Sequence, residues 1–103
     1  MEHAEDTRLE RDSIGELPVP REAYYGVQTL RARENFPMTG RMMHPDLIAN
    51  LALVKKAAAR ANLDAGMLEA RVANAIMAAC DEIIAGGLRD MFIVDAIQGG
   101  AGT

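Results

Sequence analysis

Residues 45–66 read PDLIANLALVKKAAARANLDAG, and their pattern predicts an amphipathic helix over residues 45–65. Pro45 fits the first helical position, because its missing N–H costs nothing there and its φ is already helical. Apolar residues recur every three or four positions and are expected to place one stripe against a core. This stripe consists of Leu47, Ile48, Leu51, Val54, Ala58 and Ala61. The residues expected to remain in solvent are Lys55, Lys56 and Arg60. Gly66 is expected to close the helix as a left-handed cap.

A second amphipathic helix is predicted over residues 69–86, ending at Gly86-Gly87. Its apolar stripe consists of Val72, Ile76, Met77, Cys80, Ile83 and Ile84. Cys80 is interpreted as a small core residue rather than a nucleophile, because it lies on this stripe with no histidine near it in sequence. The two helices should form an antiparallel hairpin. Isolated helices of this length are marginal in water, so their apolar faces need partners from other chain segments or other subunits.

The residues before this hairpin are less regular. Residues 1–21 are predicted to be an extended arm, irregular or with short strands, because Gly15, Pro18 and Pro20 interrupt any helical pattern. Helix-forming residues return over 22–36, where a short helix is expected, and Pro37 to His44 is interpreted as a loop. Aromatic residues are few, and alanine and aliphatic residues are many, which favours helix-on-helix packing. The predicted fold class is therefore mainly α.

Composition excludes several classes of function. The chain of 103 residues has a formal charge of −4 and a pI near 5.1, and its basic residues are scattered, so binding to nucleic acid or an anionic membrane is not expected. No stretch approaches the roughly 20 apolar residues of a membrane span, and residues 1–11 are charged where a signal peptide would be apolar. We expect a cytoplasmic protein whose partner is a small molecule or another protein. The single cysteine, with His3 and His44 far apart, predicts no metal site.

The last ten residues, 94–103, read VDAIQGGAGT and carry the most chemistry. Successive glycines accept φ values closed to other residues, so adjacent N–H groups can converge on a carboxylate or phosphate, and Thr103 adds a hydroxyl. Taken as a bare pattern, this segment favours a plain turn over an anion site, because glycine clusters are typical of turns. Asp95, flanked by apolar residues, is interpreted as a helix or loop cap with no catalytic role. Arg31 is interpreted either as a ligand for a carboxylate or as a solvated or ion-paired surface residue.

Several segments together resemble one enzyme family. They are Arg11-Asp12, Gly15-Glu16, Val19-Pro20, YYGVQTLRA at 24–32, ENFP at 34–37, LALVKKAAARAN at 51–62 and VDAIQGGAGT at 94–103. In this order and spacing they resemble the N-terminal domain of aspartate ammonia-lyases, within the aspartase/fumarase superfamily. Class II fumarate hydratases share the YGxQTxRAxENF pattern but usually carry Gly-Ser-Gly-Thr where this chain has Ala101 between two glycines. Ser13, Ile93 and Ala96 depart from the family pattern.

The resemblance implies an enzyme that reversibly removes ammonia from L-aspartate to give fumarate, working as a homotetramer without a metal or other cofactor. It implies that Thr103 binds a substrate carboxylate, supported by Gly100, Ala101 and Gly102 in a loop over residues 91–103. The family's catalytic serine lies in a later domain that is not in this chain. The resemblance therefore implies no catalytic residue here and no activity of the 103-residue chain alone. The alternatives are part of a class II fumarate hydratase and a non-catalytic helical remnant that binds another protein.

Overall fold

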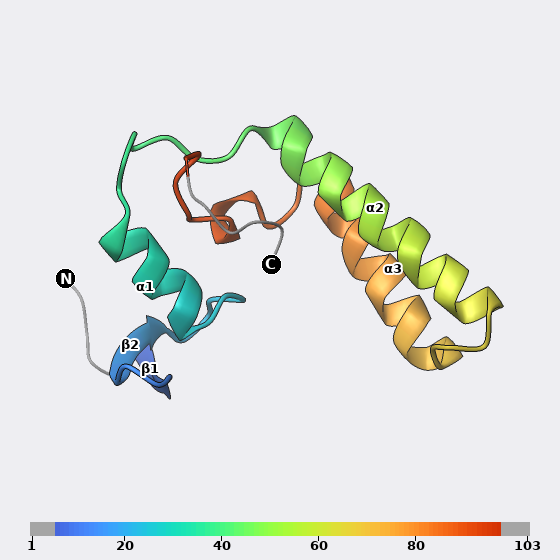
Figure 1. Ribbon diagram of the computed structural model, residues 1–103, viewed down its shortest axis with the longest axis horizontal. Coiled ribbons are helices and arrows are strands. Elements are labelled where there is room, and N and C mark those ends of the chain that lie inside the picture. The colour runs from blue at the N-terminus through green and yellow to red at the C-terminus, as the bar shows by residue number, and fades with distance from the viewer. Residues whose placement is uncertain (1–5, 98–103) are drawn as a thin grey trace. The chain divides into compact units, whose positions relative to one another are not determined.

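The computed structural model describes residues 6–97. Its elements, in order, are β1 (Thr7–Arg11), β2 (Glu16–Pro20), α1 (Val27–Asn35), α2 (Pro45–Asp64), α3 (Ala70–Ile84) and a short 3-10 helix, Arg89–Met91 (Figure 1). They belong to two compact units, one formed by residues 6–43 and 90–97 and the other by residues 44–89. Three helices with one small sheet confirm the mainly α prediction. No helix in the described part of the chain combines the length and hydropathy of a membrane span.

In the first unit, the N-terminal arm is a β-hairpin rather than an irregular segment. Strands β1 and β2 pair antiparallel, with Thr7 opposite Pro20 and Arg11 opposite Glu16. The turn between them is stabilised by Asp12, whose carboxylate accepts hydrogen bonds from the N–H groups of Ile14 (3.0 Å) and Gly15 (3.1 Å). Over the described residues, β1 and β2 pair only with each other, so the outer edge of each strand is open. Pro18 and Pro20 are tolerated on β2 because no further strand needs a hydrogen bond from their nitrogens.

The helix predicted over residues 22–36 is shorter than expected, because α1 begins at Val27. The guanidinium group of Arg8, on β1, donates hydrogen bonds of 2.9 to 3.0 Å to four backbone carbonyls in the preceding segment, which takes those carbonyls out of a helical ladder. The four acceptors are the carbonyls of Pro20, Arg21, Ala23 and Tyr25. Side chains from the hairpin therefore decide where α1 starts.

The first unit has a small apolar core. Val19, Val27 and Leu30 are buried, and the partly buried side chains that pack against them include Ile93 from the segment after the helical hairpin. The core thus joins β2, α1 and residues near the C-terminal end of the described chain. This packing brings the segment that precedes the glycine-rich residues into the same unit as α1.

The second unit is the predicted helical hairpin of α2 and α3. The His44 side chain caps α2, its Nδ1 accepting a hydrogen bond of 3.0 Å from the N–H of Asp46, and Pro45 occupies the first turn. Gly66 adopts φ +74°, the left-handed conformation expected of a C-terminal cap, and Met67 donates back to the carbonyl of Asn62 (2.8 Å). Helix α3 ends at Ile84, before the Gly86-Gly87 pair.

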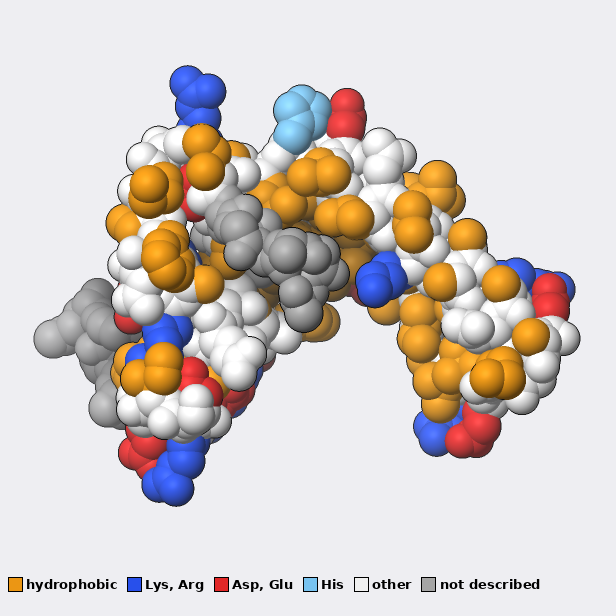
Figure 2. Space-filling view, viewed as in Figure 1, with side chains coloured by type: hydrophobic (Ala, Val, Ile, Leu, Met, Phe, Trp, Pro, Cys, Tyr) orange, Lys and Arg blue, Asp and Glu red, His pale blue; other side chains and the backbone are white. Residues whose placement is uncertain are grey.

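The face that α2 and α3 share differs from the predicted stripes. The buried residues are Ile48, Ala52 and Ala59 on α2 and Ala73 and Cys80 on α3. Most of the larger predicted stripe residues, such as Leu51 and Val54 (49% and 64% exposed), lie on the surface, and Figure 2 shows apolar side chains exposed along this hairpin. The stripe prediction is confirmed for Ile48 and Cys80 and wrong for residues such as Leu51 and Val54, because small side chains allow two helices to approach closely, whereas larger ones flank the contact. Lys56, expected in solvent, is only partly exposed and pairs with Asp81 at 2.6 Å.

Candidate functional site

Asp95 lies four positions before Gly99, the first glycine of the terminal segment, and its buried carboxylate (7% exposed) accepts four hydrogen bonds. Oδ2 accepts from the N–H groups of Thr39 (2.9 Å) and Gly40 (2.8 Å). Oδ1 accepts from the hydroxyl of Thr39 (2.8 Å) and the N–H of Ile97 (2.9 Å). The carboxylate therefore joins two segments more than fifty positions apart in sequence, and the interpretation of Asp95 as a loop cap agrees with this geometry.

The backbone on either side of this carboxylate is also paired. Ala96 donates to the carbonyl of Arg41 (2.8 Å), and Met42 forms an antiparallel bridge with Asp95. The hydroxyl of Thr39 accepts a bond of 3.0 Å from the N–H of Arg41 while it donates to the carboxylate. Residues 95–97 are thus held against residues 39–42 by both main-chain and side-chain hydrogen bonds. We call this arrangement the Asp95 anchor.

The charge of Asp95 is stabilised by these donors. The N–H of Ile97, followed by the hydroxyl and N–H of Thr39 and the N–H of Gly40, lowers the pKa of Asp95 to about 2, although burial acts in the opposite direction. The group is therefore a carboxylate at neutral pH. Because its acceptor positions face donors, it has no role as a general base in this geometry.

A cavity of about 240 Å³ lies beside the anchor. Its lining residues are Arg33, Pro37, Gly40, Arg41, Met42, Ile93 and Asp95. Both arginines are exposed, and Asp95 is committed to its four donors. Over residues 6–97, no buried side-chain nitrogen or oxygen lacks a hydrogen-bond partner. The cavity therefore presents no buried, unpaired polar group to a ligand.

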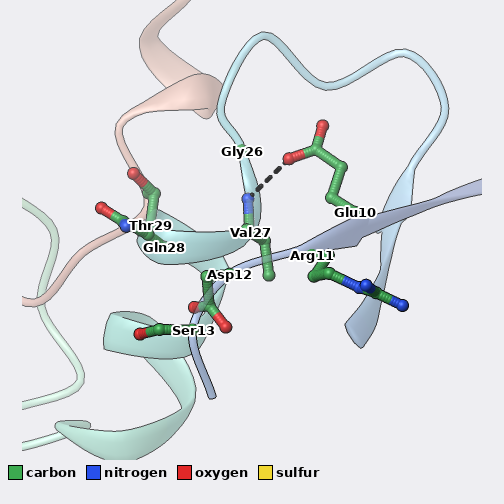
Figure 3. A pocket seen from close by; sticks show the side chains of 8 residues that line it. All are labelled: Glu10, Arg11, Asp12, Ser13, Gly26, Val27, Gln28 and Thr29. Atoms are coloured by element: carbon green, nitrogen blue, oxygen red, sulfur yellow. Dashed lines mark hydrogen bonds between the residues drawn. The ribbon is translucent and has the colours of Figure 1, made fainter. Parts of the chain in front are cut away.

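A second depression, of about 480 Å³, lies where the β-hairpin meets the start of α1 (Figure 3). Figure 3 shows the side chain of Glu10 reaching the N–H of Val27, which donates to Oε1 over 2.9 Å. A Cβ atom on Gly26 would lie 2.9 Å from the same oxygen, so the absent side chain permits this approach. Arg8 and then the Val27 N–H lower the pKa of Glu10. Glu10 therefore serves as a remote cap for α1.

Arg31 is ion-paired within the same unit. Its Nε and Nη2 atoms donate to the two carboxylate oxygens of Asp12 at 3.0 and 2.9 Å, and the two side chains are 18% and 8% exposed. This bidentate contact is the main reason that the pKa of Asp12 is lowered. Of the two interpretations of Arg31, the ion-paired one matches the structure, because the fork of its guanidinium already holds a carboxylate of the chain.

The remaining candidates have structural places. Cys80 is buried on α3, as predicted for a small core residue, and His44 caps α2. Within the described ranges, no three His, Cys, Asp or Glu side chains are arranged to hold a metal ion. The predicted substrate-binding residues Gly100, Ala101, Gly102 and Thr103 lie outside the described residues. The structure describes the backbone up to Ile97, three positions before Gly100.

Sequence reasoning missed Arg8, Thr39 and Gly40. Arg8 and Thr39 are ordinary polar residues in segments of weak periodicity, so no local pattern distinguishes them. The available signal was Asp95 itself, because a carboxylate among apolar residues must find donors if it is buried. That argument predicts donors without identifying them.

Comparison with known proteins places this geometry in a family. A sequence model of a protein family described as lyase matches residues 15–103 of the chain. The chain is 56% identical to an aspartate ammonia-lyase from a Bacillus species, over 95% of this chain and 21% of that protein. It is 51% identical to a class II fumarate hydratase from Halobacterium salinarum, over 97% of this chain and 21% of that protein. The chain thus spans about a fifth of the length of these curated relatives.

Solved structures give the same result. A fumarate lyase:delta crystallin structure from Brucella melitensis matches with a TM-score of 0.84 and 51% identity, covering 93% of this chain and 21% of that one. The recombinant class II fumarase from Schistosoma mansoni matches with a TM-score of 0.84 and 35% identity, covering 94% and 21%. Sequence and fold agree over nearly the whole chain. The chain therefore belongs to the lyase family, within the aspartase/fumarase superfamily.

Proposed function

We propose that this chain is the N-terminal part of an ammonia-lyase that converts L-aspartate reversibly to fumarate and ammonia. The observation that carries the proposal is the 56% identity to an aspartate ammonia-lyase over 95% of the chain. A second aspartate ammonia-lyase, from Bacillus subtilis, is 54% identical over 93% of the chain. Ala101 supports the same choice, because class II fumarate hydratases usually carry serine at this position of the glycine-rich segment.

In this proposal, Thr103 binds one carboxylate of the dicarboxylate substrate, and the N–H groups around Gly100, Ala101 and Gly102 add further donors. Removal of the Cβ proton of aspartate creates negative charge on the neighbouring carboxylate, and donors fixed before the reaction stabilise that charge. The amine then leaves as ammonia. The catalytic base belongs to another region of the whole enzyme, so the 103-residue chain alone should release no ammonia from aspartate.

We also propose that the whole enzyme is a cytoplasmic homotetramer that needs no cofactor for this reaction. The exposed apolar side chains of the α2–α3 hairpin, including Leu47, Leu51 and Val54, support an assembly in which other segments or subunits cover them. Size-exclusion chromatography with light scattering on the complete gene product tests this. A monomer at micromolar concentration would contradict the assembly.

The reaction itself is tested on the product of the complete reading frame that contains this chain. Fumarate is followed by its ultraviolet absorbance, starting from L-aspartate in one assay and from L-malate in another. Fumarate and ammonia from aspartate support the proposal. Fumarate from malate alone would favour the fumarate hydratase alternative, for which the 51% identity to the Halobacterium enzyme is the specific support. Activity on neither would favour a non-catalytic binding protein.

The role of Thr103 is tested with three variants of the same protein. Thr103→Val removes the hydroxyl and should lower kcat/KM by about 10²-fold, the effect of removing one donor to developing charge. Thr103→Ser keeps the hydroxyl and should retain most of the activity. Thr29→Val is the matched control, because it makes the same threonine-to-valine change at a position far from Thr103 in the sequence. Thr29 lies on α1, at the depression between the β-hairpin and that helix. Equal kcat/KM for Thr103→Val and the control would exclude the proposed contact.

A further inference from the structure

We infer that Asp95 is a positioning residue for the glycine-rich loop: its carboxylate fixes the backbone from which residues 98–103 continue. The inference rests on the proposed function for its consequence in catalysis, because that function assigns the loop to substrate binding. The physical claim about the backbone can be tested separately. Asp95 contacts no substrate in this scheme and acts only through the segment that follows it.

The first step is that the anchor is complete on both sides. The two oxygens of Asp95 receive three backbone N–H groups and one hydroxyl, all at 2.8 to 2.9 Å. Two of the three N–H groups belong to Thr39 and Gly40, and the third belongs to Ile97. A buried carboxylate with one of these donors removed would be left with an unsatisfied charge, so the arrangement favours one backbone geometry.

The second step is the direction of the effect along the chain. The bond from the N–H of Ile97 to Oδ1 and the bond from the N–H of Ala96 to the carbonyl of Arg41 orient two consecutive peptide units, Asp95–Ala96 and Ala96–Ile97. The glycines that follow, Gly99, Gly100 and Gly102, have little steric preference for any one backbone conformation. A segment of this composition depends on its fixed end for its starting direction. The Asp95 anchor supplies that end.

The third step is the consequence for binding. Donor groups lower the energy of a charged ligand most when they are aligned before it arrives, because no reorganisation is then needed. A displacement of about 1 Å in a binding or catalytic group can cost as much as about 10²-fold in rate. Weakening the anchor should therefore lower kcat/KM for the dicarboxylate, because the loop donors are proposed both to bind the substrate carboxylate and to stabilise the charge that develops on it.

Asp95→Asn is the most informative substitution, because an amide has one acceptor oxygen where the carboxylate has two. If that oxygen keeps the hydrogen bonds from the N–H groups of Thr39 and Gly40, the NH₂ group takes the place of Oδ1. It then faces the hydroxyl of Thr39 and the N–H of Ile97. The hydroxyl of Thr39 can then accept instead of donate, but the N–H of Ile97 cannot. The variant should thus keep the Thr39 side and lose the bond that orients the loop.

Two further variants complete the design. Thr39→Val removes one hydroxyl, which donates to Oδ1 and accepts from the N–H of Arg41, from an exposed residue. It should therefore fold even if Asp95→Asn does not, and it should change the same quantities less. Glu10→Gln is the matched control, because it makes the same carboxylate-to-amide change in the same unit at a helix cap that does not touch residues 95–97. All are made in the complete gene product.

Two measurements are made on each variant. The first is hydrogen exchange of the peptide covering residues 96–103, with peptides of α2 and α3 as internal reference. The second is kcat/KM for L-aspartate. We expect Asp95→Asn to speed exchange in residues 97–103 at least tenfold, with unchanged exchange in α2 and α3, and to lower kcat/KM about tenfold. Thr39→Val should give about two- to fivefold effects in the same direction, and Glu10→Gln none.

Each outcome of these measurements either supports or overturns the positioning role of Asp95. Unchanged exchange of residues 97–103 in both Asp95→Asn and Thr39→Val would overturn the inference, whatever the activity. Equal effects in all three variants would also overturn it, because they would reflect general destabilisation. Faster exchange at the loop in a protein that shows no deamination of aspartate would uphold the positioning role and refute the proposed function instead.

Discussion

Replacing Arg8 with methionine should loosen the start of α1 selectively. Methionine keeps an unbranched apolar stem of similar length but removes every donor of the guanidinium. Two of the carbonyls that Arg8 binds, those of Ala23 and Tyr25, are in part-buried contacts, and the other two are exposed and can bind water instead. Loss of the contact with Glu10, at 2.7 Å, acts in the same direction.

The expected magnitude follows from those two part-buried bonds. A hydrogen bond from a charged donor contributes about 1.5–3 kcal/mol, and the lower end applies because the Arg8 side chain is 32% exposed. Two such bonds give a loss of about 3 kcal/mol in the free energy that opens this region. Since about 1.4 kcal/mol corresponds to a factor of ten, amide exchange in β2 and α1 should accelerate about 10²-fold.

Hydrogen exchange with mass spectrometry on the complete gene product measures this, with Arg11→Met as the control. Arg11 lies on the same strand, but its ion pair with Glu16 joins side chains that are 76% and 52% exposed, so its loss should cost at most about 0.5 kcal/mol. The reasoning is refuted if both variants exchange alike in residues 16–35, or if Arg8→Met accelerates exchange equally in α2 and α3.

Three further results are expected. Gly66→Ala should lower the unfolding free energy of the helical hairpin by about 1 kcal/mol, because φ is +74° and no atom crowds the added methyl; an unchanged urea midpoint would contradict the left-handed cap. Ala73→Leu should destabilise the hairpin by about 1–3 kcal/mol, since Ala73 is 0% exposed, whereas Ala78→Leu on the exposed face should be nearly neutral; thermal unfolding of both variants compares them. Acid should destabilise the first unit, because the pKa values of Asp12 and Asp95 are lowered in the folded state, that of Asp95 to about 2 from 3.8. Their contribution is fully present above the unfolded pKa and is lost as pH falls from about 4 to about 2, so a stability that stays flat over this range would refute the assignment.

The local sequence contained enough information for the secondary structure of the second unit. Pro45 at a helix start and Gly66 after its end act through their own backbone preferences, which depend on nothing outside a few residues. The glycine-rich segment at 94–103 and the family resemblance are likewise evident from the sequence alone, because each depends only on residue type and order. The assignment of Thr103 as a substrate ligand stays a prediction, because that residue lies outside the described part of the chain.

Three features required the folded chain. Helix α1 begins at Val27 because Glu10, seventeen positions earlier, caps it. Asp95 finds its donors at Thr39, fifty-six positions away, and the sequence could predict only that a buried carboxylate must have some. The shared face of the hairpin buries alanines while Leu51 stays exposed. Periodicity and residue preference act over one or two turns of chain, so they specify helices and caps. Hydrogen bonds and packing between distant segments depend on which surfaces meet, and the three-dimensional fold alone brings those surfaces together.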